Sequence, residues 1–70
     1  MPTLLRVDGF RFAFYAGDGI EPPHVHVSKG GASAKVWLRP VRVQYAYGFT
    51  PAEFRRVHEL VVKHEGLFGR

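Results

Sequence analysis

The fold is decided by the stretch Thr3-Leu4-Leu5-Arg6-Val7-Asp8-Gly9-Phe10-Arg11-Phe12-Ala13-Phe14-Tyr15. Two β-rich runs, 3–7 and 10–15, flank Asp8-Gly9, and this dipeptide between alternating apolar residues is the strongest short-range signal for a β-hairpin. A two-residue turn there pairs Val7 with Phe10 and fixes the register. The phenylalanines then share one face of the hairpin, and the arginines at positions 6 and 11 share the other.

Three more strands and one helix follow along the chain. Alternation predicts strands over 24–28, 34–38 and 41–45, and strict alternation in the last of them places Tyr45 on the same face as Val43. Thr50-Pro51-Ala52-Glu53 is the pattern of a capping box, which predicts a helix over about 51–65. The sequence therefore predicts a single α+β domain over residues 1–70. Its antiparallel sheet has four to five strands within 3–47, in the order β-β-β-β-β-α, and the helix packs on one face.

Composition excludes several classes of protein. The chain of 70 residues contains no cysteine, which excludes disulfides, cysteine-ligated zinc and a thiol nucleophile. No apolar run approaches the ~20 residues that a membrane-spanning helix needs, and the first residues resemble no signal peptide. We therefore expect a cytoplasmic protein with no membrane partner. Ten Lys and Arg against six Asp and Glu give a net charge of +4, a modest bias toward acidic partners.

One helix can cover only one face of such a sheet, so the opposite face is predicted to be exposed in the monomer. Alternation places on it Arg6, Arg11, Tyr15, His24, His26, Lys35, Trp37, Arg39, Arg42 and Gln44. Basic side chains contact phosphates, and aromatic rings stack on unpaired bases. The predicted nucleic-acid-binding residues are therefore Arg6, Arg11, Lys35, Trp37, Arg39 and Arg42. The alternatives are a solvated face and a face buried in a homodimer.

The most distinctive stretch is Glu21-Pro22-Pro23-His24-Val25-His26-Val27. The prolines deliver the strand rigidly, and its two histidines lie side by side on one face. Two neighbouring imidazoles can supply a general base and a general acid, while Lys35 or Arg11 stabilises a phosphorane-like transition state. His24, His26 and Lys35 are therefore the predicted catalytic residues of a metal-independent ribonuclease.

Two other interpretations of the histidines remain open. They could ligate a divalent metal with Glu21 or Asp18 as the third ligand, or they could merely hydrogen-bond their neighbours. Because two histidines without a fixed third ligand are a weak metal signal, we expect neither a metal nor a cofactor.

The chain also resembles a known family in several motifs. Met1-Pro2-Thr3-Leu4-Leu5-Arg6, Gly9-Phe10-Arg11-Phe12, the stretch 21–27, Gly31-Ala32-Ser33-Ala34-Lys35-Val36-Trp37-Leu38 and Tyr47-Gly48-Phe49-Thr50 together are similar to the DUF4160 family. The likeness extends from residue 1 to about 64. It implies a small bacterial or phage protein of uncharacterised function, in a family whose members are often suspected toxins of type II toxin–antitoxin modules. The family's recurring positions carry over as Pro23, His24, His26, Lys35 and Trp37.

Two functional hypotheses follow. The leading one is a toxin-like component that acts on RNA or the translation machinery through the basic, histidine-containing face, beside a cognate antitoxin of the DUF2442 type that the resemblance implies. The alternative is a non-enzymatic module that binds an acidic protein or a second copy through the same face, with Trp37 as its anchor. A phage-encoded inhibitor using that face belongs to the same alternative.

Overall fold

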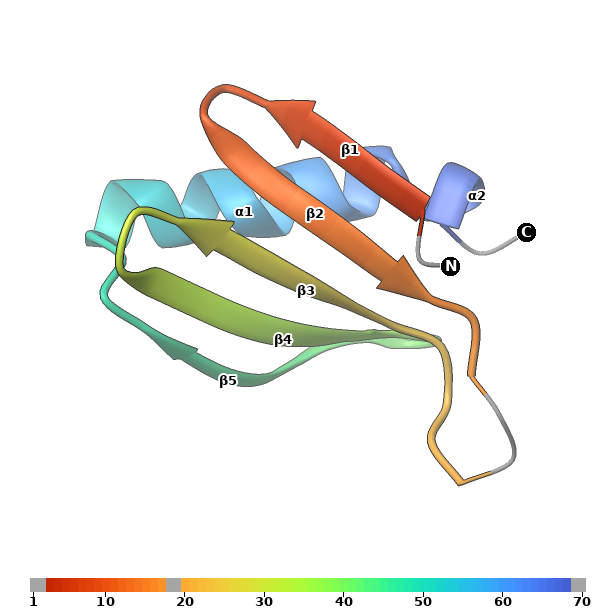
Figure 1. The fold of residues 1–70 in the computed structure, drawn as a ribbon. Coiled ribbons are helices and arrows are strands. Elements are labelled where there is room, and N and C mark those ends of the chain that lie inside the picture. The colour runs from red at the N-terminus through yellow and green to blue at the C-terminus, as the bar shows by residue number, and fades with distance from the viewer. Residues whose placement is uncertain (1–2, 18–19, 69–70) are drawn as a thin grey trace.

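The computed structural model describes residues 3–17 and 20–68, which form one sheet with a helix behind it. The elements are β1 (Thr3–Val7), β2 (Phe10–Tyr15), β3 (His24–Lys29), β4 (Ala32–Leu38), β5 (Val41–Tyr47), α1 (Pro51–Lys63) and α2 (Glu65–Phe68). The strands are antiparallel in the order β1-β2-β3-β4-β5, and α1 lies across one face (Figure 1). The predicted α+β class and element order are confirmed.

The Asp8-Gly9 turn sets the register of the first hairpin as predicted. Asp8 and Gly9 have φ angles of 54° and 82°, the two positive values that a type I′ turn requires. Val7 pairs with Phe10 and Arg6 pairs with Arg11. The two arginines therefore lie opposite each other on one face, an arrangement that destabilises the hairpin unless an anion lies nearby.

The hydrophobic core lies between α1 and the sheet face beneath it, which we call the inner face. Its buried side chains come from three strands and the helix: Phe10, Phe12, Phe14, Val25, Val27, Ala34, Val36, Leu38, Val57, Leu60 and Val61. Side chains alternate between faces along a strand, so the residues that alternate with these core residues, such as His24, His26 and Lys35, project from the opposite side, the outer face. No helix covers the outer face in the described part of the chain (Figure 1).

The helix α1 begins at the predicted capping box. The Thr50 hydroxyl accepts from the Glu53 backbone N–H at 3.1 Å, and the Glu53 carboxylate accepts from the Thr50 N–H at 2.9 Å. The helix ends at Lys63, two residues before the predicted end. His64 is the C-cap, and its backbone N–H donates to the Leu60 carbonyl at 3.0 Å. Within the described residues, no helix is both long and apolar enough to span a membrane.

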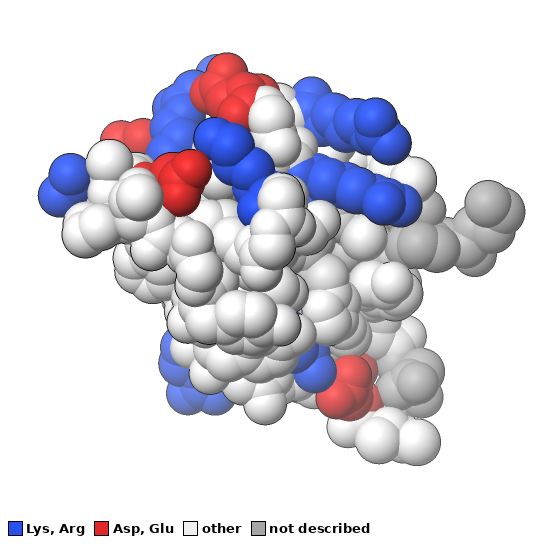
Figure 2. All heavy atoms as spheres, turned by 60° about the vertical axis from the view of Figure 1, so that its left-hand side comes forward, with Lys and Arg blue, Asp and Glu red and all other residues white. Residues whose placement is uncertain are grey.

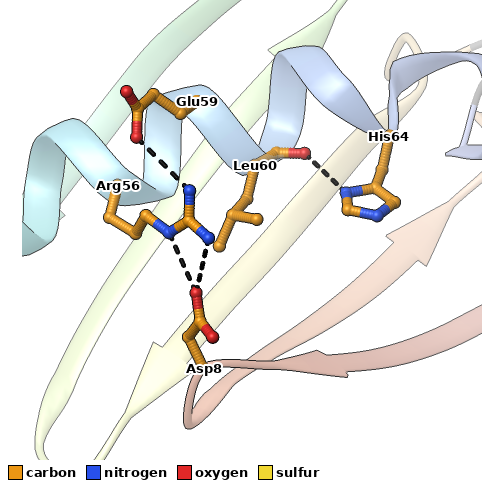
Figure 3. Close-up of polar contacts among 5 residues, drawn as sticks. All are labelled: Asp8, Arg56, Glu59, Leu60 and His64. Atoms are coloured by element: carbon orange, nitrogen blue, oxygen red, sulfur yellow. Dashed lines mark hydrogen bonds and ion pairs between the residues drawn. The ribbon is translucent and has the colours of Figure 1, made fainter.

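An ion pair joins α1 to the first turn of the chain. The Nε and Nη2 atoms of Arg56 donate to the same carboxylate oxygen of Asp8 at 2.9 and 2.7 Å (Figure 3). This hydrogen bonding raises the pKa of Arg56, and the contact to Glu59 adds to it. The helix is thereby tied to the turn that sets the sheet register.

A β-bulge in β5 breaks the alternation that the sequence suggested. Lys35 pairs with Tyr45 whereas Val36 pairs with Val43, so Gln44 is an extra residue on β5. Strict alternation was wrong for Tyr45, which lies on the outer face beside Lys35 rather than with Val43. Tyr45 stacks there on Tyr47, with ring centroids 6.0 Å apart.

Gly48, directly after β5, is a position where a substitution tests the packing of the fold. Gly48 has a φ of 84°, and a Cβ added to it would lie 2.8 Å from the Ala32 Cα. We expect Gly48→Ala to lower the free energy of unfolding by about 2 kcal/mol or more, because it adds a strained backbone and a clash with β4. Urea denaturation measures the loss.

Gly31→Ala is the matched control, because a Cβ at that position would meet nothing within 4 Å. Its free energy of unfolding should stay within about 0.5 kcal/mol of the wild-type value. Equal losses in the two variants would contradict the packing described for Gly48.

Candidate functional site

The predicted catalytic residues lie together at the centre of the outer face. The rings of His24 and His26 have centroids 5.1 Å apart and are close to perpendicular, at 73°. Lys35 is the cross-strand partner of His26, and Trp37 is the partner of His24. Tyr15 on β2 pairs with His24 from the other side. The register therefore brings the predicted residues side by side, and their catalytic role stays a prediction.

The centre of the outer face is not exposed, contrary to the sequence-based expectation. His24 is only 7% exposed and Lys35 only 9%. The Tyr15 ring stacks on His24 at 5.2 Å and 13°, and the Trp37 ring meets it edge-on at 5.5 Å. Large side chains on neighbouring strands thus cover one another, and this closes the face without a second layer of structure.

Lys35 has its charge neutralised within the cluster. Its Nζ donates to the Glu21 Oε2 at 3.0 Å and lies 4.6 Å from the centroid of the Trp37 ring. A buried ammonium group requires an opposite charge, which Glu21 provides, and the indole face adds a cation–π contact. In this conformation the Lys35 ammonium group is therefore paired with the Glu21 carboxylate.

Glu21 also reaches His24, with its other oxygen Oε1 3.8 Å from the His24 Nε2. The His24 Nδ1 lies 3.1 Å from the Pro22 carbonyl oxygen. Because a carbonyl only accepts hydrogen bonds, Nδ1 carries the proton and Nε2 is the atom that faces Glu21. We call the six residues Tyr15, Glu21, His24, His26, Lys35 and Trp37 the outer-face cluster.

The sequence interpretation considered Glu21 only as a metal ligand and missed its contact with Lys35. The available signal was the rigid Pro22-Pro23 pair, which holds the preceding residue next to the start of β3. Asp18, the other proposed third ligand, lies outside the described residues. Residues 3–17 and 20–68 contain no group of three His, Asp or Glu side chains placed to hold a metal ion. The metal-site interpretation therefore gains no support from the described part of the chain.

A cavity of about 500 Å³ borders the cluster at the end of β2 and the start of β3. It is lined by Tyr15, Ala16, Gly17, Glu21, His24 and His26. Its volume lies in the range of small-molecule binding sites, which run from about 300 to 1,000 Å³. Both histidines line this cavity, so a ligand bound there would contact them.

His26 is the histidine whose protonation the cluster alters most clearly. Partial burial lowers the pKa of His26 from its ordinary value of 6.5, and the positive charges of His24 and Lys35 lower it further, while Glu21 opposes them. At neutral pH the imidazole is therefore neutral and retains a lone pair. A neutral imidazole in a cavity wall is a competent general base.

The predicted phosphate-binding residues are spread over more than one region. Arg6 and Arg11 are exposed and form no ion pair with any described residue, and Arg42 pairs across the strands with Trp37. Arg39 lies in the turn after β4 and not on the strand itself. In Figure 2 the positive side chains form separate groups along the upper and lower edges, with uncharged surface between them. The basic residues therefore form no single continuous patch in this view.

Comparison with known proteins identifies the family. A family model described as a domain of unknown function (DUF4160) matches residues 9–68. The chain belongs to the DUF4160 family. No curated protein and no solved structure matches it. The match spans β2 to α2 and therefore contains every residue of the outer-face cluster. The family's description names no activity, and the outer-face cluster is the feature of this DUF4160 protein that points to a function.

The lowered pKa of His26 in this DUF4160 protein gives a pH prediction. The folded state binds fewer protons than the unfolded state at pH values between the lowered pKa and 6.5. The free energy of unfolding should therefore fall as the pH falls below about 6.5 and be fully regained above it. Urea denaturation at several pH values measures the effect, and an NMR titration of the His26 ring gives its pKa directly.

Two lysine variants show the cause of the shift. Lys35→Met should raise the pKa of His26, because it removes one of the two neighbouring positive charges that lower it while the opposing charge of Glu21 stays. Lys63→Met, on the helix behind the sheet, should leave it unchanged. A wild-type His26 that titrates at or above 6.5 would contradict the environment described for this residue.

Proposed function

We propose that this DUF4160 protein is a toxin-like component of a toxin–antitoxin module that binds single-stranded RNA on its outer face and cleaves it without a metal ion. The observation that supports this most is the grouping of His24, His26 and Lys35 on adjacent strands, with both histidines lining a cavity of about 500 Å³. A cognate antitoxin of the DUF2442 type is the partner that the family resemblance implies. The net charge of +4 fits either an RNA or an acidic protein as the ligand.

The proposed chemistry is an internal transesterification of the RNA backbone. His26 removes the proton from a ribose 2′-hydroxyl, and the oxygen attacks the adjacent phosphorus. His24, when protonated on both ring nitrogens, gives its Nε2 proton to the departing 5′-oxygen as the P–O bond breaks, while Nδ1 keeps its proton on the Pro22 carbonyl. Lys35 stabilises the negative charge that builds up on the phosphate oxygens. The products are a 2′,3′-cyclic phosphate and a free 5′-hydroxyl, so that no metal and no external oxidant or reductant is consumed.

The two paired arginines would bind the neighbouring phosphate. Ala13 pairs with His26 across β2 and β3, and Arg11 lies two residues earlier on β2, about 7 Å along the strand. Arg6 lies directly opposite Arg11. A phosphate between these guanidinium groups would relieve the repulsion of two like charges. This arrangement gives the RNA a direction across the face, from the arginine pair toward the histidines.

Tyr15 is better placed than Trp37 to stack on a base. One face of the indole of Trp37 is occupied by the Lys35 ammonium group, and its edge meets His24. Tyr15 is 41% exposed and stacks on His24 through one face of its ring. Base stacking on an exposed aromatic ring is tolerant of sequence, so we expect modest sequence preference at this position.

Removal of the proposed base tests the enzymatic function. We expect the wild type to arrest bacterial growth on induction and to cleave a single-stranded RNA to 2′,3′-cyclic phosphate ends in the presence of EDTA. His26→Asn should reduce the cleavage rate by about 100-fold or more, the usual cost of losing a general base. His58→Asn, on the exposed surface of α1, is the matched control and should cleave at the wild-type rate.

Two outcomes would contradict the enzymatic proposal. One is full cleavage activity in a folded His26→Asn protein. The other is a wild type that neither cleaves RNA nor arrests growth.

A second candidate function is protein binding through the free edge of the sheet. Tyr45 and Tyr47 are 40% and 61% exposed on β5, the edge strand, and their rings stack. Beside them an apolar groove of about 440 Å³ is lined by Val43, Ala46, Tyr47, Phe49, Thr50, Pro51 and Phe54. An edge strand has unpaired backbone groups that another strand can join. Because Tyr45 and Tyr47 are exposed, they are better placed to anchor a protein partner than Trp37, which is half-buried.

Self-association is the simplest test of the second candidate. If β5 joins the β5 strand of a second copy, sedimentation of the wild type should depend on concentration in the micromolar range. Tyr47→Ala should shift the population toward monomer without lowering the free energy of unfolding, because the side chain is mostly exposed. A wild type that remains monomeric at every concentration would exclude a homodimer through this edge.

A further inference from the structure

We propose that the outer-face cluster contains an oxyanion-binding site which the carboxylate of Glu21 fills in the ligand-free protein, and that a phosphate group binds there by displacing Glu21. The inference deepens the proposed function and rests on it for the identity of the ligand, a phosphodiester of RNA. It assigns Glu21 the role of an internal competitor, which neither the family description nor the sequence interpretation gives to this residue.

Lys35 and His24 contact the Glu21 carboxylate as they would contact a bound anion, and we call these two residues the receptor. One oxygen accepts from the Lys35 Nζ at 3.0 Å, and the other lies 3.8 Å from the His24 Nε2. The two nitrogens come from adjacent strands, β4 and β3, where Lys35 and His24 are diagonal neighbours in the register. A phosphate group also presents two oxygens to two neighbouring nitrogens. Because Nδ1 of His24 donates to the Pro22 carbonyl, its Nε2 donates to the phosphate when the ring is doubly protonated, and the bond is then charge-assisted like that of Lys35.

The receptor is buried, whereas the carboxylate that fills it is not. The side chains of Lys35 and His24 are 11% and 8% exposed, but that of Glu21 is 47% exposed. Glu21 also lies outside the strands, so no sheet pairing depends on its position. Its side chain can therefore turn into solvent while the two nitrogens stay in place. Burying an ammonium group without a partner costs free energy. Glu21 therefore leaves Lys35 only as another anion takes its place.

The backbone at Glu21 is held firmly, which confines the exchange to the side chain. Gly17 has a φ of 89°, and a Cβ added to it would lie 2.9 Å from the Glu21 carbonyl oxygen and 3.0 Å from the Pro23 nitrogen. The two ends of the β2–β3 connection are thus in close contact at Gly17. Pro22 and Pro23 add their fixed φ angles to this constraint. Exchange of anions then takes place by rotation about the side-chain bonds of Glu21.

The cavity next to the receptor has room for a ligand larger than a carboxylate. Its volume of about 500 Å³ is bounded by Glu21 itself together with Tyr15, His24 and His26. A phosphate bound at Lys35 and His24 would place its ester groups in this space. The proposed base, His26, would then face the ribose next to the bound phosphate.

The test compares two variants with the same change in net charge. Inorganic phosphate and an uncleavable 2′-O-methyl RNA oligonucleotide are titrated into each protein, and binding is followed by the NMR signals of the His24 and His26 rings. Glu21→Gln should bind both probes about tenfold more tightly than the wild type, within the usual range of coupling between two sites. Glu59→Gln, which alters an exposed carboxylate on α1, should bind as the wild type does. Lys35→Met should abolish phosphate binding in both backgrounds.

Each outcome separates the inference from the function on which it rests. Equal affinities in Glu21→Gln and Glu59→Gln overturn the inference, even if the wild type binds and cleaves RNA. Tighter phosphate binding without oligonucleotide binding supports the oxyanion site and overturns the RNA ligand. If a variant fails to fold, a measurement on the wild type still tests the inference. Saturating phosphate should move the Glu21 carboxyl ¹³C signal to that of a solvated glutamate, and an unmoved signal overturns the inference.

Discussion

The structure depends on one constraint: a single long helix, α1, can cover only one face of the five-stranded sheet. α1 covers the inner face (Figure 1). The centre of the outer face is covered by its own side chains, which are paired across neighbouring strands. In the central row, His24 is covered by the rings of Tyr15 and Trp37. The same packing buries Lys35, whose charge then has to be neutralised by Glu21. The polar cluster is thus a physical consequence of a half-covered sheet.

The register of the first turn determines which residues enter this cluster. The Asp8-Gly9 turn pairs Val7 with Phe10, and the pairing continues across the sheet until Tyr15 lies opposite His24. A slip of one residue would send the histidines into the apolar core and the valines into the cluster. The ion pair from α1 to Asp8 holds the helix against this turn (Figure 3). The turn, the core and the site therefore form one connected set of constraints.

The sequence predicts those features that are set by local periodicity and misses those set by contacts across the chain. Hairpin, helix cap and the shared face of His24, His26 and Lys35 follow from the turn residues, the capping box and the period of two. The position of Tyr45 does not follow, because the bulge at Gln44 arises from how β5 aligns with β4. The contact between Glu21 and Lys35 spans 14 residues and depends on the path of the β2–β3 connection, which no periodic pattern encodes.

The two candidate functions are physically compatible because their surfaces adjoin. Lys35 is the cross-strand partner of Tyr45, so the aromatic edge of β5 lies one strand, about 5 Å, from the oxyanion site. A protein bound along β5 would contact Tyr45 and Tyr47 and restrict access to Lys35 from that side. RNA approaching from the arginine pair would reach the cluster across β1 and β2, at the opposite edge. A partner on β5 would therefore restrict the site without occupying the path of the RNA.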